Sequence, residues 1–173
     1  MKISPIILIA ILLSSCAPIR VHYDFEKGTD FSNYKTYNYY SDMKTGLSEL
    51  DTKRFLEALD AKLDVLGITF SETPDFYIDI KSFQYEAAQQ NTLGIGLGSG
   101  GRNAGGGISF GLPIGQAEMN RQISIDFVDE NGKGLFWEAV SESGFTPNAS
   151  PQNRDAQLNA VVEKMLSQYP PKS

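Results

Sequence analysis

The pair Asn131-Gly132 constrains the fold of this chain more than any other feature of its sequence. It lies between two runs, 122–128 and 134–140, in which apolar and polar residues alternate. Asn-Gly is the pair that tight hairpin turns favour, and alternation is the pattern of a strand with one buried face. The sequence therefore predicts an antiparallel hairpin here, and with it a domain built around a sheet.

Three further segments, 21–25, 35–40 and 75–85, have the alternation or the β-branched and aromatic composition of strands. In the third we expect the core side to hold Phe76, Ile78, Ile80 and either Phe83 or Tyr85. The aromatic residues of the last two segments have two interpretations: they line a ligand groove, or they pack in the sheet and against helices. Because aromatic side chains are ordinary strand formers, packing is the favoured interpretation.

Two segments change to the period of a helix. An apolar stripe capped by Ser48 and ended by Gly67 predicts the first, and a stripe that opens at Ser150-Pro151 and stops at Pro170-Pro171 predicts the second. We therefore expect an α+β fold, an antiparallel β-sheet with two helices packed on one face. A length of 173 residues suits a single domain.

The first 16 residues combine one positive charge at Lys2, a short apolar run over 6–13 and the sequence Leu13-Ser14-Ser15-Cys16. The run is too short to cross a membrane, which needs about 20 apolar residues. Its last four residues resemble the lipobox of bacterial lipoproteins. The resemblance implies cleavage between Ser15 and Cys16, a diacylglyceryl group on the Cys16 thiol and acylation of the new amine. Labelled palmitate would report these acyl chains.

This interpretation divides the chain into a signal peptide (1–15), a lipidated tether (16–20) and one α+β domain (21–173). The acyl chains on Cys16 would hold the protein on a membrane. Because residue 17 is Ala and not Asp, we expect the outer membrane, on its periplasmic side. The inner membrane and the cell surface stay open as alternatives.

A glycine-rich insertion occupies about 91–117, and ten of the 16 glycines lie between Gly94 and Gly115. Large apolar residues alternate with the glycines on both sides of its centre, among them Leu93, Ile95, Leu97, Ile108, Phe110 and Leu112. The segment is either an ordered glycine-faced hairpin or a disordered loop. As a hairpin it would be a contact element for self-association or for a membrane.

Composition removes several classes of function. A net charge of −6 argues against a nucleic-acid binder, and one His with one Cys cannot build a zinc site or a disulfide framework. His22 lies on the polar side of its strand segment, with no identifiable nucleophile beside it. We expect no catalytic residue, no metal and no cofactor.

The landmarks of the chain, taken in order, resemble the lipoprotein family labelled domain of unknown function 4136. They are Val21-His22-Tyr23-Asp24-Phe25, then Asp30-Phe31-Ser32-Asn33-Tyr34-Lys35-Thr36-Tyr37, Pro74-Asp75-Phe76-Tyr77-Ile78, the hairpin with Leu135-Phe136-Trp137, and Tyr169-Pro170-Pro171. Where the family's hairpin usually continues with arginine or glycine, this chain has Glu138. The resemblance implies an envelope lipoprotein without an assigned reaction, so it supplies no catalytic residues.

These observations favour a lipid-anchored, non-enzymatic domain that binds or scaffolds other envelope components. Its expected partners are the membrane, through Cys16, and an envelope protein or a second copy of itself. The alternative is a carrier of a small apolar or lipid ligand, held between the sheet and the helices. An enzyme is the third choice.

Overall fold

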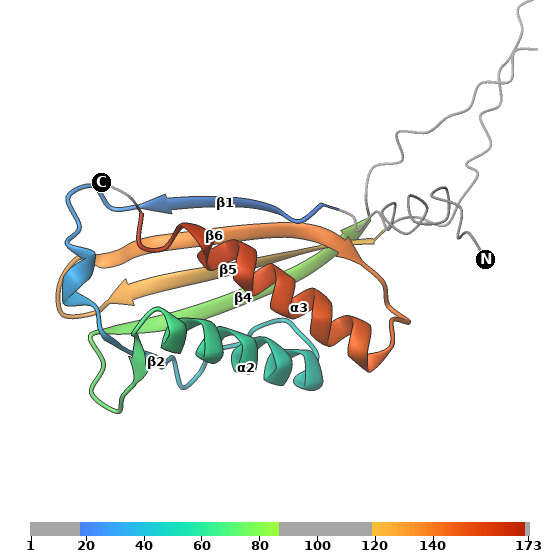
Figure 1. Ribbon diagram of the computed structural model, residues 1–173, viewed down its shortest axis with the longest axis horizontal. Coiled ribbons are helices and arrows are strands. Elements are labelled where there is room, and N and C mark those ends of the chain that lie inside the picture. Colours follow the sequence, from blue (N-terminus) through green and yellow to red (C-terminus); the bar gives the residue numbers. More distant parts are fainter. Residues whose placement is uncertain (1–17, 87–118, 172–173) are drawn as a thin grey trace, which may run out of the picture.

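A six-stranded sheet carries two α-helices on one of its faces (Figure 1). The structure is a computed structural model that describes residues 18–86 and 119–171. The strands are β1 (Arg20–Phe25), β2 (Thr36–Tyr39), β3 (Thr69–Phe70), β4 (Phe76–Glu86), β5 (Met119–Asp129) and β6 (Gly134–Phe145). The helices are α2 (Glu49–Val65) and α3 (Pro151–Met165), with short 3₁₀ turns at η2 (Phe31–Asn33) and η3 (Leu166–Gln168). Across the sheet the order is β1-β6-β5-β4-β2-β3.

The predicted hairpin is confirmed as the antiparallel pair β5–β6. Its turn differs from the expected tight form, because the positive φ angle falls on Gly134 (75°) and not on Asn131 or Gly132. The Asp129 side chain supports the wider turn by accepting from the backbone N–H of Asn131 at 3.0 Å. A bulge between Phe127 and Val128 shifts the register next to this turn.

The expectation of a purely antiparallel sheet is wrong, because β2 pairs in parallel with both β3 and β4. The cause lies in the connection: α2 carries the chain back along the sheet, so β4 starts at the same end as β2 and runs in the same direction. The remaining pairs, β1–β6, β6–β5 and β5–β4, are antiparallel. The fold is therefore α+β with a mixed sheet.

Both helices start where the sequence predicts. Ser48 caps α2 by accepting from the N–H of Asp51 at 3.3 Å, and Ser150 caps α3 by accepting from the N–H of Asn153 at 3.2 Å. Beyond α2 the chain turns at Gly67, which has a φ of 78°. The helices lie against each other and against the same sheet face (Figure 1).

The core fills the space between this helical layer and the sheet. Its largest side chains without solvent exposure are Trp137, Phe55, Phe76, Phe127, Phe136, Leu59, Leu63, Ile78, Ile80, Ile123, Ile125 and Met165. Because side chains fill this interior, it gives no support to the alternative that a ligand is carried between the sheet and the helices.

One expected side-chain direction on β4 is wrong. Phe76, Ile78 and Ile80 are fully buried, as predicted, but Phe83 is 54% exposed. Because side chains alternate strictly along a strand, Ser82 takes the core-side position, and Phe83 and Tyr85 lie on the opposite face.

Several predictions fall outside the described residues: the signal peptide, the lipidation site at Cys16 and the contact segment at Leu93, Ile95, Leu97, Ile108, Phe110 and Leu112. They stay predictions. Within 18–86 and 119–171 there is no helix of the length and apolar character needed to cross a membrane.

Candidate functional site

The sheet face opposite α2 and α3, which we call the outer face, is covered by no helix of the described chain (Figure 1). Strand register and alternation assign its side chains. They are Arg20, His22 and Asp24 from β1; Glu138, Val140 and Glu142 from β6; Gln122, Ser124 and Asp126 from β5; and Tyr77, Asp79, Lys81, Phe83 and Tyr85 from β4. Most are polar, so the face is suited to contact with water or with a polar partner.

Four carboxylates form one row across the outer face. Asp79 lies opposite Asp126, Asp126 opposite Glu138, and Glu138 opposite Asp24, on four neighbouring strands. Like charges directly opposite each other destabilise a sheet, by up to about 1 kcal/mol per pair. The row is therefore a local cost to the fold, and it concentrates negative charge on one line.

Lys81 offsets part of this charge. Its Nζ lies 2.7 Å from Asp79 Oδ2 and 3.6 Å from Asp126 Oδ2. The hydrogen bond to Asp79 raises the pKa of Lys81. The pKa of Asp126 is also raised, chiefly by burial and further by the charge of Asp79, while Lys81 acts in the opposite direction.

Aromatic side chains flank the row of carboxylates. Tyr40 stacks on Tyr77 with ring centroids 5.1 Å apart, and burial, followed by a hydrogen bond with Glu130, raises the pKa of Tyr40 to about 12. Towards the other end of β4, the rings of Phe83 and Tyr85 lie 6.0 Å apart. The outer face thus offers apolar contact area on both sides of a charged centre, as protein interfaces often do.

A hollow of about 150 Å³ lies where β1 ends and β6 begins. Its lining residues are Asp24, Phe25, Glu26, Leu135, Phe136, Trp137 and Glu138. Small-molecule pockets usually enclose about 300–1,000 Å³, so this hollow does not have the size of a typical ligand site. Among the described residues, no three His, Cys, Asp or Glu side chains are placed to hold a metal ion.

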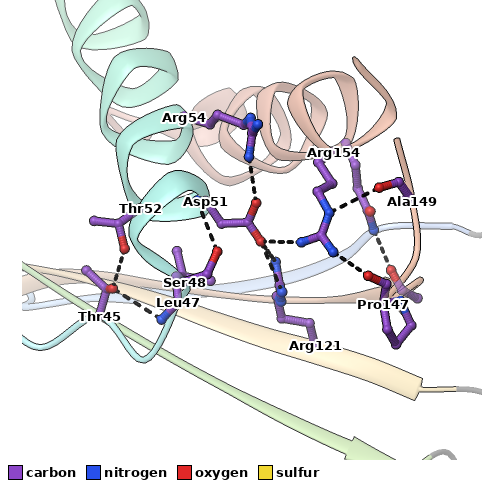
Figure 2. A network of polar contacts seen from close by, with 12 residues as sticks. Thr45, Leu47, Ser48, Asp51, Thr52, Arg54, Arg121, Pro147, Ala149 and Arg154 are labelled. Atoms are coloured by element: carbon purple, nitrogen blue, oxygen red, sulfur yellow. Dashed lines mark hydrogen bonds and ion pairs between the residues drawn. The ribbon is translucent and has the colours of Figure 1, made fainter. Parts of the chain in front are cut away.

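A second polar cluster is buried on the helical side (Figure 2). The carboxylate of Asp51, 1% exposed, accepts from Arg54 at 3.1 Å through Oδ1, and through Oδ2 from Arg154 at 2.9 Å and Arg121 at 3.3 Å. These residues come from α2, α3 and β5, so one carboxylate joins three elements. Arg154 also donates to the carbonyls of Ala149 and Pro147.

The contacts of this cluster point to a structural role. Guanidinium groups stay protonated in proteins and so give up no proton at ordinary pH. Arg121 lies with its guanidinium carbon 3.9 Å from the centre of the Phe145 ring, a cation–π contact. Sequence reasoning missed the cluster, although Arg121 occupies the same strand phase as the buried residues Ile123 and Ile125.

The structure separates the candidate residues of the sequence. His22 lies on the outer face opposite Val140, away from the buried arginines. Asp75, from the landmark that leads into β4, accepts from the N–H groups of Lys35 and Thr36 at 2.9 and 2.8 Å. Both arrangements fit structural roles.

Aromatic residues from several of the landmarks that carry the family resemblance gather in one cluster. Tyr34 stacks on Phe136 with centroids 3.9 Å apart, and Tyr169 meets Phe31 at 5.5 Å and Trp137 at 5.2 Å. These contacts join the start, the hairpin and the end of the domain. These aromatic residues therefore belong to the core or pack against it.

Comparisons with known proteins identify a family and a likeness of fold. A family model described as a domain of unknown function (DUF4136) matches residues 21–171. No curated protein matches the chain. The crystal structure of a PDZ domain protein from Parabacteroides distasonis superposes with a TM-score of 0.57 at 19% identity, covering 95% of this chain and 39% of that one. The chain thus spans about two fifths of that protein, and the likeness concerns the fold. PelC from Paraburkholderia phytofirmans, solved as a dodecamer, gives a TM-score of 0.44 at 7% identity over 87% of this chain and 96% of that one.

Proposed function

The chain belongs to the family described as a domain of unknown function (DUF4136), and from that premise we propose that it is a lipid-anchored cell-envelope protein whose domain binds or scaffolds other envelope components. It catalyses no reaction, and it sits on the periplasmic side of the outer membrane. The anchor is the acylated Cys16, four positions before β1 begins at Arg20.

The observation that carries this proposal is the outer face. One side of the sheet is packed against helices, while the other presents a row of carboxylates between two aromatic pairs. A sheet face with half-buried and exposed aromatic rings around a polar centre offers both area and directional contacts to another protein. The packed core and the small hollow give less support to a small ligand.

The anchor is tested by labelling cells with palmitate. We expect the full chain to incorporate label and to fractionate with the envelope membranes, and Cys16→Ala to lose both properties. A Cys16→Ala chain that still takes up label and stays in the membrane fraction contradicts the anchor.

Binding is tested separately, by photo-crosslinking in cells. A photoreactive residue at Ser124, in the middle of the outer face, should give defined adducts with envelope proteins. The matched control is the same residue at Glu57, whose side chain is 64% exposed on α2. Identical adducts from the two positions, or none from Ser124, would show that the outer face is not the binding surface.

A further inference from the structure

β1 is an edge strand, and its open side pairs with no strand of the described chain. The N–H of Glu26 donates to the carbonyl of Phe136 in β6 at 3.0 Å, whereas the N–H of Phe25 points the other way and donates to Asp24 Oδ1 at 2.8 Å. Because these directions alternate along an antiparallel strand, the backbone groups of Val21 and Tyr23 point to the open side. An unpaired edge of this kind is a template for another strand.

The residues of this edge are self-complementary. The Asp24 side chain accepts from the N–H of Phe25. Val21 and Tyr23 are therefore the residues of β1 whose backbone groups can bond to a further strand, and His22 lies midway between them. A second β1, antiparallel and centred on His22, places Val21 opposite Tyr23 of the second copy. It also places Arg20 opposite Asp24 of the second copy, twice over because of the two-fold symmetry.

We propose that two copies of this chain pair through β1, in the register that sets His22 opposite His22 of the second copy. Four backbone hydrogen bonds form, from Val21 and Tyr23 of each copy, together with two opposite-charge pairs. Tyr23, 40% exposed in the single chain, gains a neighbour in Val21 of the second copy. The two sheets continue into one.

Charge complementarity favours a second β1, and not the glycine-rich segment of the same chain, as the strand that pairs with β1. From Ala87 to Ala117 the only charged residue is Arg102, so that segment cannot match both Arg20 and Asp24. Charged side chains on an edge strand usually discourage pairing. Here each charge meets its opposite in a second copy, and so favours that copy over strands of other sequence.

Pairing about His22 extends the proposed function. The two-fold axis is perpendicular to the sheet, so the two outer faces lie side by side and form one double-length surface. Self-pairing does not depend on what binds that surface. A failure of the Ser124 crosslinks and a failure of β1 pairing are therefore separate results.

The test uses the full chain with His22→Cys, expressed in cells and oxidised. In a non-hydrogen-bonded antiparallel pair the two Cα atoms are about 4.5 Å apart, within the range that a disulfide spans. We expect a disulfide-linked species of twice the monomer mass. The parent chain, whose single cysteine is Cys16, and the chain with Ser124→Cys, on the same face but inside the sheet, should give none.

Charge reversal then tests the register. In the His22→Cys background, Arg20→Asp should reduce the crosslinked fraction severalfold, and adding Asp24→Arg should restore it because opposite charges again face each other. Circular dichroism checks that each variant folds, since Arg20 also lies opposite Glu142 within the chain.

Tyr23→Pro removes an N–H that faces away from β6, so it should block dimer formation while the domain folds, and Tyr23→Thr should not. Absence of the crosslink, a crosslinked product of another mass, or equal crosslinking in the Arg20→Asp chain would each overturn the proposal.

Discussion

Asp51 and Arg154 meet at 2.9 Å between the first turns of two helices that lie far apart in the sequence. The same carboxylate also binds Arg54 and Arg121, so a single negative charge serves three positive ones (Figure 2). This contact fixes how the start of α2 sits against the start of α3 and against β5. Removal of the Asp51 carboxylate would leave these three guanidinium groups close together without a counter-charge.

We therefore expect Asp51→Asn to lower the free energy of unfolding by about 3–5 kcal/mol, the range for breaking a buried ion pair on one side. Urea unfolding followed by circular dichroism measures it. The matched control is Glu57→Gln, which removes the exposed pair with Lys53 on the same helix and should cost about 0.5 kcal/mol or less. Equal losses from the two substitutions would mean that the cluster does not hold the helices.

Gly46 and Gly67 both have positive φ angles, 71° and 78°, but only Gly46 touches a neighbouring strand. A Cβ at Gly46 would lie 2.2 Å from the carbonyl oxygen of Ser82, while one at Gly67 would meet nothing within 4 Å. Gly67→Ala should cost about 1–2 kcal/mol of backbone strain. Gly46→Ala should cost clearly more, because β4 must also move. Thermal unfolding of the two variants compares them, and equal melting temperatures would refute the close approach.

Tyr34 donates its hydroxyl proton to Asp129 Oδ2 at 3.0 Å. Burial, then this bond, raises the pKa of Tyr34 to about 12 from an ordinary value of 10.0. The folded state thus keeps a proton that the unfolded chain releases, so the stability from Tyr34 is complete below about pH 10 and is lost as the pH rises towards 12. Urea midpoints measured across this window should fall less steeply for Tyr34→Phe than for the parent. An unchanged slope would contradict this assignment.

On the outer face, Lys81 and Asp79 act on Asp126 in opposite directions. Lys81→Gln removes the positive charge 3.6 Å from Asp126 and should raise the pKa of Asp126 further. Asp79→Asn removes a negative charge and leaves Lys81 to Asp126, so it should lower the same pKa. NMR titration of the Asp126 carboxyl carbon follows both. Shifts of the same sign in the two variants would rule out the described arrangement.

The sequence predicts the elements of this fold better than their connections. The stripe after Ser48 and the runs around Asn131-Gly132 are local patterns, and the structure confirms the helix and the hairpin that they indicate. The direction of β2 relative to β4 is not contained in the alternation of either strand, because parallel and antiparallel strands share a period of two. It follows from the helix between them, which was itself predictable.

The candidate site was harder to predict, for a physical reason. The row from Asp79 to Asp24 exists only through the register of four strands. Of its three pairings, only the β5–β6 hairpin has a local sequence pattern; β4–β5 and β1–β6 join segments that no local pattern connects. Likewise, Asp51 is a polar residue on a helix until α3 and β5 bury it. Long-range packing, and not residue type, creates both features.

The neighbours of β1 determine the order in which this domain can be completed. The first strand of the sheet pairs with the last, Arg20 lying opposite Glu142, whereas β5 and β6 can pair as soon as both exist. Contacts between distant segments slow folding, because a long stretch of chain must be ordered before they form. A chain that is synthesised from its N-terminus therefore has to hold β1 unpaired until β6 has been made. During that interval the vacant side of β6 is open to the β1 of another copy, so exchange of this strand between copies is the assembly error to which this topology is most exposed.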